Sequence, residues 1–117
     1  MKHHFEASVL YDFYKSLLTE KQREAYDLYY NDDFTMEEIA EETGTTRQAV
    51  SLLIKASNKR LEKAESDLKM VSNYYKMENW KEDFQTFYNK AIKRNDCPDD
   101  VKNELFALIS DLESIER

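Results

Sequence analysis

Three lysines, Lys55, Lys59 and Lys63, lie four residues apart near the middle of the chain. In a helix this spacing puts all three amines on one face, because residues four apart are neighbours on a helix surface. Such a row can contact phosphate groups or acidic side chains. The whole chain carries a formal net charge of −7 at pH 7, which argues against a general nucleic-acid binder. The lysines therefore predict a local contact surface on an otherwise acidic protein.

The residues that precede these lysines could add specificity to the contact. Gln48 falls on the same predicted face and could hydrogen-bond to an adenine edge. Leu52 puts a bulky apolar group where a DNA reader usually has a polar one, which favours a protein partner; the alternative is a singly exposed leucine without function. Arg47 lies nearer the inner edge, where it could pair with acidic residues or touch a ligand. The full predicted contact set is Thr46, Arg47, Gln48, Ser51, Leu52, Lys55, Lys59 and Lys63.

The charge distribution confines the basic character to one segment. Residues 20–42 contain nine acidic and two basic side chains. Residues 45–63 contain five basic side chains and a single acidic one, Glu62. We therefore expect one basic helix beside an acidic part of the protein.

No arrangement of residues suggests catalysis. The sequence has no phosphate-binding glycine loop, no nucleophile paired with a base and no spacing typical of metal ligands, so we expect a non-enzymatic protein without cofactor or metal. Its one cysteine, Cys97, cannot form an intramolecular disulfide. The start of the chain lacks the apolar run of a signal peptide, and no stretch approaches the roughly 20 apolar residues of a membrane span. A cytoplasmic protein that does not enter the membrane is the expectation.

The composition predicts an all-α fold. A chain of 117 residues that is 41% hydrophobic and 35% charged suits one globular domain. One glycine and one proline leave little material for the tight turns of a sheet protein. Lysine, glutamate, leucine and alanine are abundant, and these residues favour helix.

Apolar periodicity divides the first part of the chain into four helices, at about residues 4–18, 19–30, 36–43 and 46–75. Threonines mark where the later helices begin. In a capping box, a threonine hydroxyl accepts from the backbone N–H three residues on, and the side chain at that position reaches back. Three pairs fit this pattern: Thr19 with Gln22, Thr35 with Glu38, and Thr45 with Gln48.

The two helices at 36–43 and 46–75 have the spacing of a helix-turn-helix. Such a unit needs a small residue where its helices cross, a glycine in the turn and apolar residues that clamp the second helix. Ala40 is the small residue, Gly44 lies in the turn, and Val50 and Leu53 fall on the inward side of the second helix. An ordinary helical hairpin is the alternative, but it would need neither the small residue nor the glycine.

The second helix of this unit continues without a breaker, so we expect it to reach residue 75 and to measure about 45 Å. Two apolar series follow it, and Pro98 begins the last helix. The predicted organisation is a helix-turn-helix domain at 1–76 and a C-terminal helical pair at 77–117 within the same compact unit. The two series either fold back on the long helix or meet a second copy of the chain, and we expect a homodimer. They are Met77, Trp80, Phe84, Phe87, Tyr88, Ala91 and Ile92, and the heptad Val101, Leu105, Leu108, Leu112 and Ile115.

Four short segments together form a recognisable pattern: Leu17-Leu18-Thr19-Glu20-Lys21-Gln22, Leu28-Tyr29-Tyr30-Asn31-Asp32-Asp33, Glu38-Ile39-Ala40-Glu41-Glu42 and Arg47-Gln48-Ala49-Val50. With them the chain resembles the YlxM family, whose members are helix-turn-helix proteins encoded beside the signal recognition particle genes. The similarity spans about residues 9–76, and the helix-turn-helix itself resembles region 4 of bacterial sigma factors. The family usually has an aromatic residue where this chain has Ser51, and polar residues where it has Leu52 and Leu53.

This resemblance implies a regulatory role in the signal recognition particle pathway, through the particle's protein GTPase, its RNA or both. The alternative is a dimeric transcription factor that reads duplex DNA. In either case the contact residues on the helix that begins near residue 46 would make the interaction. The lysines would supply the electrostatic part, and Gln48 and Leu52 the specific part.

Overall fold

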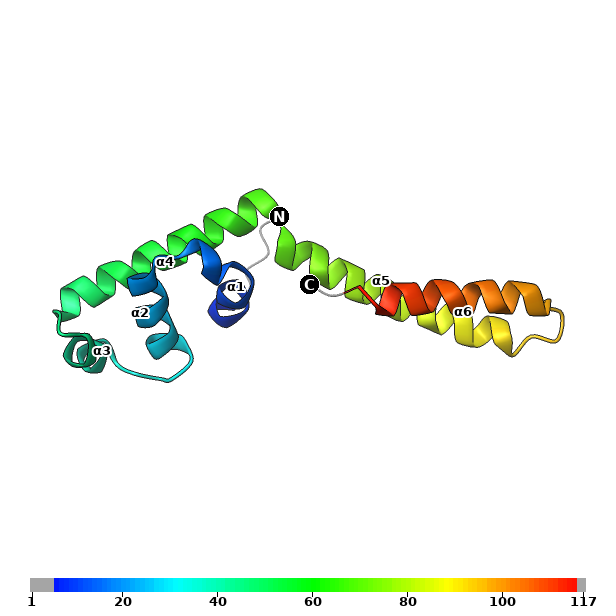
Figure 1. The fold of residues 1–117 in the computed structure, drawn as a ribbon, viewed down its shortest axis with the longest axis horizontal. Helices are drawn as coiled ribbons and strands as arrows, with labels where there is room; N and C mark the ends of the chain where they lie inside the picture. Colours follow the sequence, from blue (N-terminus) through cyan, green and yellow to red (C-terminus); the bar gives the residue numbers. More distant parts are fainter. Residues whose placement is uncertain (1–5, 116–117) are drawn as a thin grey trace. The chain divides into compact units, whose positions relative to one another are not determined.

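The computed structural model describes residues 6–115, and the chain in this range is all-α, as predicted. It forms six α-helices and one short 3-10 helix, with no strand among the residues described (Figure 1). None of these helices has an apolar stretch long enough to span a bilayer. The elements are α1 (Ala7–Tyr14), η1 (Lys15–Leu17), α2 (Glu20–Tyr30), α3 (Met36–Thr43), α4 (Arg47–Leu68), α5 (Met70–Ile92) and α6 (Asp99–Glu113).

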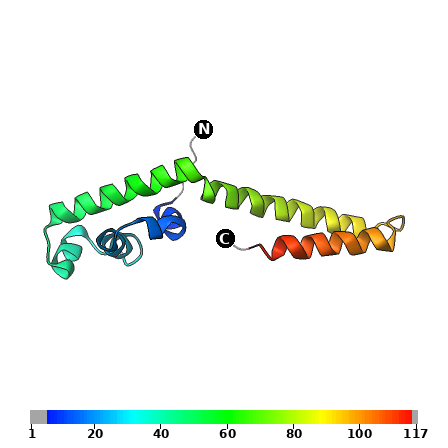
Figure 2. The same cartoon turned by 45° about the horizontal axis from the view of Figure 1, so that its top comes forward.

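Two compact units divide the chain between Ser72 and Asn73, four residues before the predicted boundary. The first unit holds the helix-turn-helix, formed by α3 and α4. The second holds most of α5 and all of α6, which run antiparallel beside each other in both views (Figures 1 and 2). That the two units pack as one compact body stays a prediction.

The first predicted helix is shorter than the sequence indicated. Its predicted start at residue 4 lies outside the described residues, and the described helix α1 begins at Ala7. The α-helix then ends at Tyr14 rather than near residue 18, and η1 follows it. The prediction of one continuous α-helix to residue 18 was therefore wrong. Leu10, Tyr14 and Leu18 are nevertheless all buried, so the change from α-helix to the tighter 3-10 helix keeps apolar residues four apart on the inner side.

Two of the three predicted capping boxes are confirmed. Thr19 accepts from the Gln22 backbone N–H while the Gln22 side chain accepts from the Thr19 N–H, at 3.2 and 2.9 Å. Thr35 and Glu38 make the same pair of bonds, both at 3.1 Å. These contacts satisfy backbone donors that a helix start leaves without partners. They fix where α2 and α3 begin.

The third predicted capping box is wrong by one residue. The cap of α4 is Thr46, whose hydroxyl accepts from the Ala49 N–H at 3.1 Å, rather than Thr45 with Gln48. Thr45 belongs to the preceding turn, because its N–H donates to the Ala40 carbonyl at 2.9 Å and completes the end of α3. Both threonines are therefore used, but for different helix ends.

Gly44 ends α3 in the left-handed conformation, with φ +70°. A Cβ at this position would meet no atom within 4 Å, so only the backbone conformation disfavours a side chain. We expect Gly44→Ala to lower the free energy of unfolding by about 1 kcal/mol, since the left-handed region is costly for alanine. Urea unfolding measures this change. Gly44→Asn should cost less because asparagine tolerates this region, and an alanine variant as stable as the parent would contradict the assignment.

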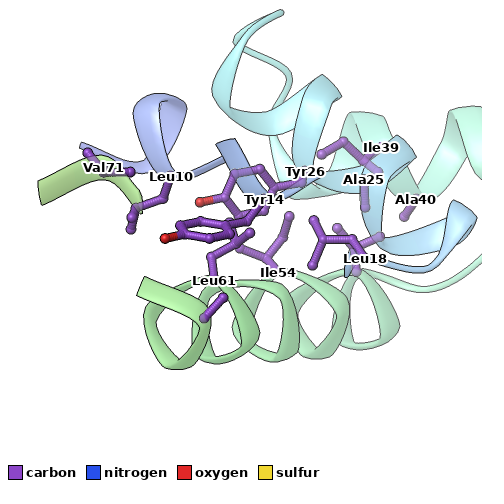
Figure 3. Packing of buried hydrophobic residues seen from close by; sticks show 12 residues of the cluster. Leu10, Tyr14, Leu18, Ala25, Tyr26, Ile39, Ala40, Ile54, Leu61 and Val71 are labelled. Atoms are coloured by element: carbon purple, nitrogen blue, oxygen red, sulfur yellow. The ribbon is translucent and has the colours of Figure 1, made fainter. Parts of the chain in front are cut away.

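The core of the first unit forms along the inner face of α4. Val50, Ile54, Ser57 and Leu61 are all buried there, and Val50 was predicted to face inward. Ser57 is polar, but its hydroxyl donates to the Leu53 carbonyl at 2.7 Å and so has a partner. Figure 3 shows this face lying under the side chains of the preceding helices. The buried residues that pack on it are Leu10, Tyr14, Leu18, Ala25, Tyr26, Ile39 and Ala40.

The predicted continuation of this helix to residue 75 is wrong. α4 ends at Leu68, Lys69 takes the left-handed conformation with φ 55°, and α5 begins at Met70. The cause is a pair of side chains, Tyr14 and Glu65, which accept from the backbone N–H groups at the start of the new helix. The Tyr14 hydroxyl accepts from the Met70 N–H at 2.9 Å, and the Glu65 carboxylate accepts from the two N–H groups that follow, both at 3.0 Å. Tyr14 also donates to Glu65, which joins the two acceptors.

Candidate functional site

The outer face of α4 is exposed to solvent along its length. Leu52 is 67% exposed. Gln48, Lys55, Lys59 and Lys63 are exposed as well, whereas the residues on the opposite face are buried. The structure therefore brings together on one surface the residues that the lysine spacing placed there.

The three lysines differ in their surroundings. Lys63 lies 2.8 Å from the Asp67 carboxylate, one helical turn further on, which partly neutralises its charge. Lys55 and Lys59 make no ion pair within residues 6–115. These two amines are therefore the stronger candidates for an external anion.

Two of the other polar residues of the predicted set, Thr46 and Arg47, make contacts at the start of α4. Thr46 uses its hydroxyl as the cap of α4, and Ser51 is only half-buried. Arg47 donates from Nε to the Glu37 carboxylate of α3 at 2.7 Å, with both side chains largely exposed. Of the two roles foreseen for Arg47, the structure shows the pairing with an acidic residue.

Glu37 is held in its charged form at this contact. The pKa of its carboxyl lies below the usual range, first because the carboxyl accepts from its own backbone N–H and second because the Arg47 guanidinium is close. The pair is exposed, so it contributes little to stability. It does connect the two helices of the helix-turn-helix across their turn.

An apolar groove lies beside the outer face and was not predicted from the sequence. Its volume is about 530 Å³. One wall comes from α4, where its lining residues follow the spacing of a single helical stripe, and the other comes from α2 and the turn. Alanines and leucines make up most of its apolar lining, and its volume leaves room for a large apolar side chain. The lining residues are Lys21, Glu24, Ala25, Thr43, Thr45, Ala49, Leu52, Leu53 and Ala56.

Leu52 connects the groove to the lysine face. It is therefore not an isolated surface leucine, because its side chain lines the groove while Lys55 and Lys59 follow on the same helix. The small residues Ala49 and Ala56, seven apart on α4, were the sequence feature that could have revealed the groove. Its other wall, at Ala25, depends on how α2 crosses α4 and has no local signature.

The helix α3 carries only acidic charges. Glu37, Glu38, Glu41 and Glu42 are exposed, and the helix has no lysine or arginine. In the usual docking of a helix-turn-helix on duplex DNA, the first helix crosses the phosphate backbone. Four carboxylates there would repel phosphate. This charge pattern favours a partner other than duplex DNA in that orientation.

No metal centre is formed by the described part of the chain. In residues 6–115, no three side chains of histidine, cysteine, aspartate or glutamate come together as metal ligands. The free Cys97 is half-buried in the turn before α6.

Comparisons with known proteins agree with this architecture. Residues 1–104 match the UPF0122 family, described as "Putative helix-turn-helix protein, YlxM / p13 like". A UPF0122 protein of Halalkalibacterium halodurans is 38% identical over 107 residues, which cover 92% of this chain and 91% of the relative. A UPF0122 protein of Clostridium acetobutylicum is 46% identical over 85 residues, 73% of each chain. One from Streptococcus agalactiae is 49% identical over 67 residues, 57% of this chain and 61% of the relative. This chain belongs to the UPF0122 family of YlxM-like helix-turn-helix proteins.

Proposed function

We propose that this protein is a non-catalytic accessory factor of the signal recognition particle pathway in the cytoplasm. It docks on the particle's GTPase, its RNA or both through the outer face of α4. The observation that carries the proposal is the surface on which Lys55 and Lys59, which form no ion pair with the part of the chain that the structure describes, lie beside Leu52 and its apolar groove. The resemblance to YlxM proteins supports the choice of pathway.

The surface is preorganised for binding because α4 is fixed from its start. Thr46 caps its first turn, and its inner face is buried in the core. A polar network also ties it to α2: the Tyr26 hydroxyl donates to Asn58 Oδ1 at 2.7 Å, and Asn58 Nδ2 donates to the Tyr30 hydroxyl at 3.2 Å. A rigid helix loses little conformational freedom when a partner covers it, which favours affinity.

The chemistry of the face suits a mixed contact. Lys55 and Lys59 attract phosphate or carboxylate groups, and Leu52 with the groove can take up an apolar side chain. RNA alone would use the lysines. An acidic amphipathic helix of the GTPase would use both the lysines and the groove.

A dimeric DNA-binding regulator is the second candidate function. The observation that favours it is Gln48, which is exposed in the first turn of the second helix of the helix-turn-helix, where base contacts are commonly made. The carboxylates of α3 count against it. We therefore rank it below the particle.

Reversing the two free charges should weaken binding to the particle. We expect Lys55→Glu/Lys59→Glu to bind labelled particle RNA or GTPase about tenfold more weakly or worse, since each change replaces an attraction with a repulsion. Lys15→Glu/Lys93→Glu makes the same change in net charge elsewhere and should bind like the parent. Fluorescence anisotropy with each component, and with duplex DNA, at two salt concentrations measures this.

Leu52→Lys separates the classes of partner in the same assay. It removes an apolar contact and adds a positive charge beside the lysines. Binding to the GTPase should fall, whereas binding to RNA or DNA should hold or rise. If the parent protein binds neither particle component, or binds one sequence of duplex DNA far more tightly than either, the particle is not its partner.

A further inference from the structure

The second unit leaves large apolar side chains in contact with solvent. Among its described residues only Ile109 is buried, at 7% exposure. Trp80 is 57% exposed, Phe87 55% and Leu108 53%. Two helices alone cannot cover so much apolar surface, and units of this size usually gain a core by association.

The apolar residues follow coiled-coil spacing on both helices. On α5 they alternate steps of three and four residues, and on α6 steps of four and three, which is the pattern of helices that pack side by side in a bundle. The α5 series is Met77, Trp80, Phe84, Phe87 and Ala91, and the α6 series is Val101, Leu105, Leu108 and Leu112, with Ile115 just beyond the end of the helix.

Both series open onto the same side of the helical pair. At about 100° per residue, Trp80 and Phe87 lie about 100° from the direction in which α5 faces α6. Val101 and Leu108 lie about 80° from the direction in which α6 faces α5. The two helices are antiparallel (Figures 1 and 2). In an antiparallel pair these two rotations point to the same side. Phe106 projects to the opposite side, where its ring lies 6.4 Å from that of Tyr88.

We propose that this side of the α5–α6 pair is a dimerisation surface, and that a second copy of the chain covers it to complete a four-helix bundle. The exposed side chains include aromatic ones, Trp80 and Phe87, and large apolar side chains of this kind dominate the energetics of protein interfaces. A partner that brings its own pair of apolar helices closes such a core into a four-helix bundle.

Charges along the edges favour a second copy in one orientation. The edge of α5 beside the apolar series carries Lys76, Asp83 and Lys90, and all three are exposed. The corresponding edge of α6 carries only acids, Asp100, Glu104 and Asp111. Packing α6 against α6 of the other copy would bring carboxylates together. A twofold axis parallel to the helices instead sets α5 beside the partner's α6, which places basic residues against acidic ones.

The dimer would carry two helix-turn-helix units in one molecule. A ligand with two sites would then be held by both, and its apparent affinity would exceed that of a single unit. This consequence does not depend on which macromolecule the outer face of α4 binds.

Sedimentation velocity of the full chain from about 1 to about 100 µM tests the proposal. We expect twice the chain mass of 14.0 kDa at the upper end. Trp80 is the only tryptophan, so its emission reports the interface directly and should shift to longer wavelength as the dimer dissociates on dilution.

Variants identify the surface. Phe87→Lys/Leu108→Lys keeps the Trp80 reporter and should sediment as a monomer with red-shifted emission. Phe106→Lys changes an equally exposed aromatic residue on the opposite side and should remain a dimer. Circular dichroism checks that both stay helical, and Leu108→Ser is a milder variant if the double change unfolds the pair. A parent protein that is monomeric at all concentrations, or a Phe87→Lys/Leu108→Lys variant that remains a dimer, would overturn the proposal.

Discussion

Replacing Leu61 with alanine is expected to lower the free energy of unfolding of the first unit by about 3 kcal/mol. Leu61 is fully buried, with 0% exposure, and lies on the inner face of α4 beneath Tyr14 (Figure 3). The substitution removes apolar atoms from the core and leaves a cavity that the helices can fill only in part. Urea unfolding followed by far-ultraviolet circular dichroism gives the change in free energy.

Leu52→Ala is the matched control for this experiment. It makes the same chemical change on the same helix, but at a side chain that is 67% exposed. We expect a change of about 0.5 kcal/mol or less. Equal losses at the two positions would show that α4 does not have one buried and one exposed face, and the binding surface proposed for it would have no basis.

The helix-turn-helix could be predicted from the sequence because its determinants are local. A threonine and the residue three positions later cap each of α2 and α3, and Gly44 supplies the left-handed turn at φ +70°. These contacts span only a few residues, so residue type and spacing are enough to identify them. The error at Thr45 shows the limit of prediction from local spacing. Two adjacent threonines could each cap α4, and only the observed turn shows that Thr46 is the cap.

The end of α4 could not be predicted in this way. No proline or glycine marks Lys69, and the apolar periodicity runs through it. The break depends on Tyr14, whose hydroxyl reaches the Met70 N–H from 56 residues away in the chain. Periodicity reports which face of a helix is buried, but not whether a distant side chain provides acceptors for a new helix start.

The candidate site was predicted in its composition but not in its shape. Lysine spacing identified the outer face of α4, and the acidic character of α3 explains why Arg47 is paired with Glu37. The groove was missed because its walls come from α2 and α4, whose crossing places Ala25 opposite Ala49. Packing of this kind depends on tertiary contacts, which one sequence without its structure does not contain.

Replacing Glu65 with alanine is expected to be about as destabilising as the loss of Leu61, at about 3 kcal/mol. Its carboxylate accepts from the Val71 and Ser72 N–H groups at 3.0 Å, and from the Tyr14 hydroxyl. Alanine leaves these donors without their acceptor in a partly buried place. Unfolding in urea measures the loss. Glu62→Ala, an exposed glutamate three residues earlier, is the control and should change stability little.

The burial of Tyr14 and its hydrogen bond to Glu65 give this junction a dependence on pH that tests the same contacts. Burial, followed by the hydrogen bond to Glu65, raises the pKa of Tyr14 from 10.0 to about 12. A pKa that is higher in the folded than in the unfolded state stabilises the fold fully below pH 10, and this contribution is lost as the pH rises from 10 to 12. The urea midpoint of the parent should therefore fall between pH 10 and 12. Burial also raises the pKa of Tyr26, so the difference between the parent and Tyr14→Phe is the relevant quantity. If the two lose stability in parallel over this range, the phenol does not hold the carboxylate at the start of α5, and another contact must end α4.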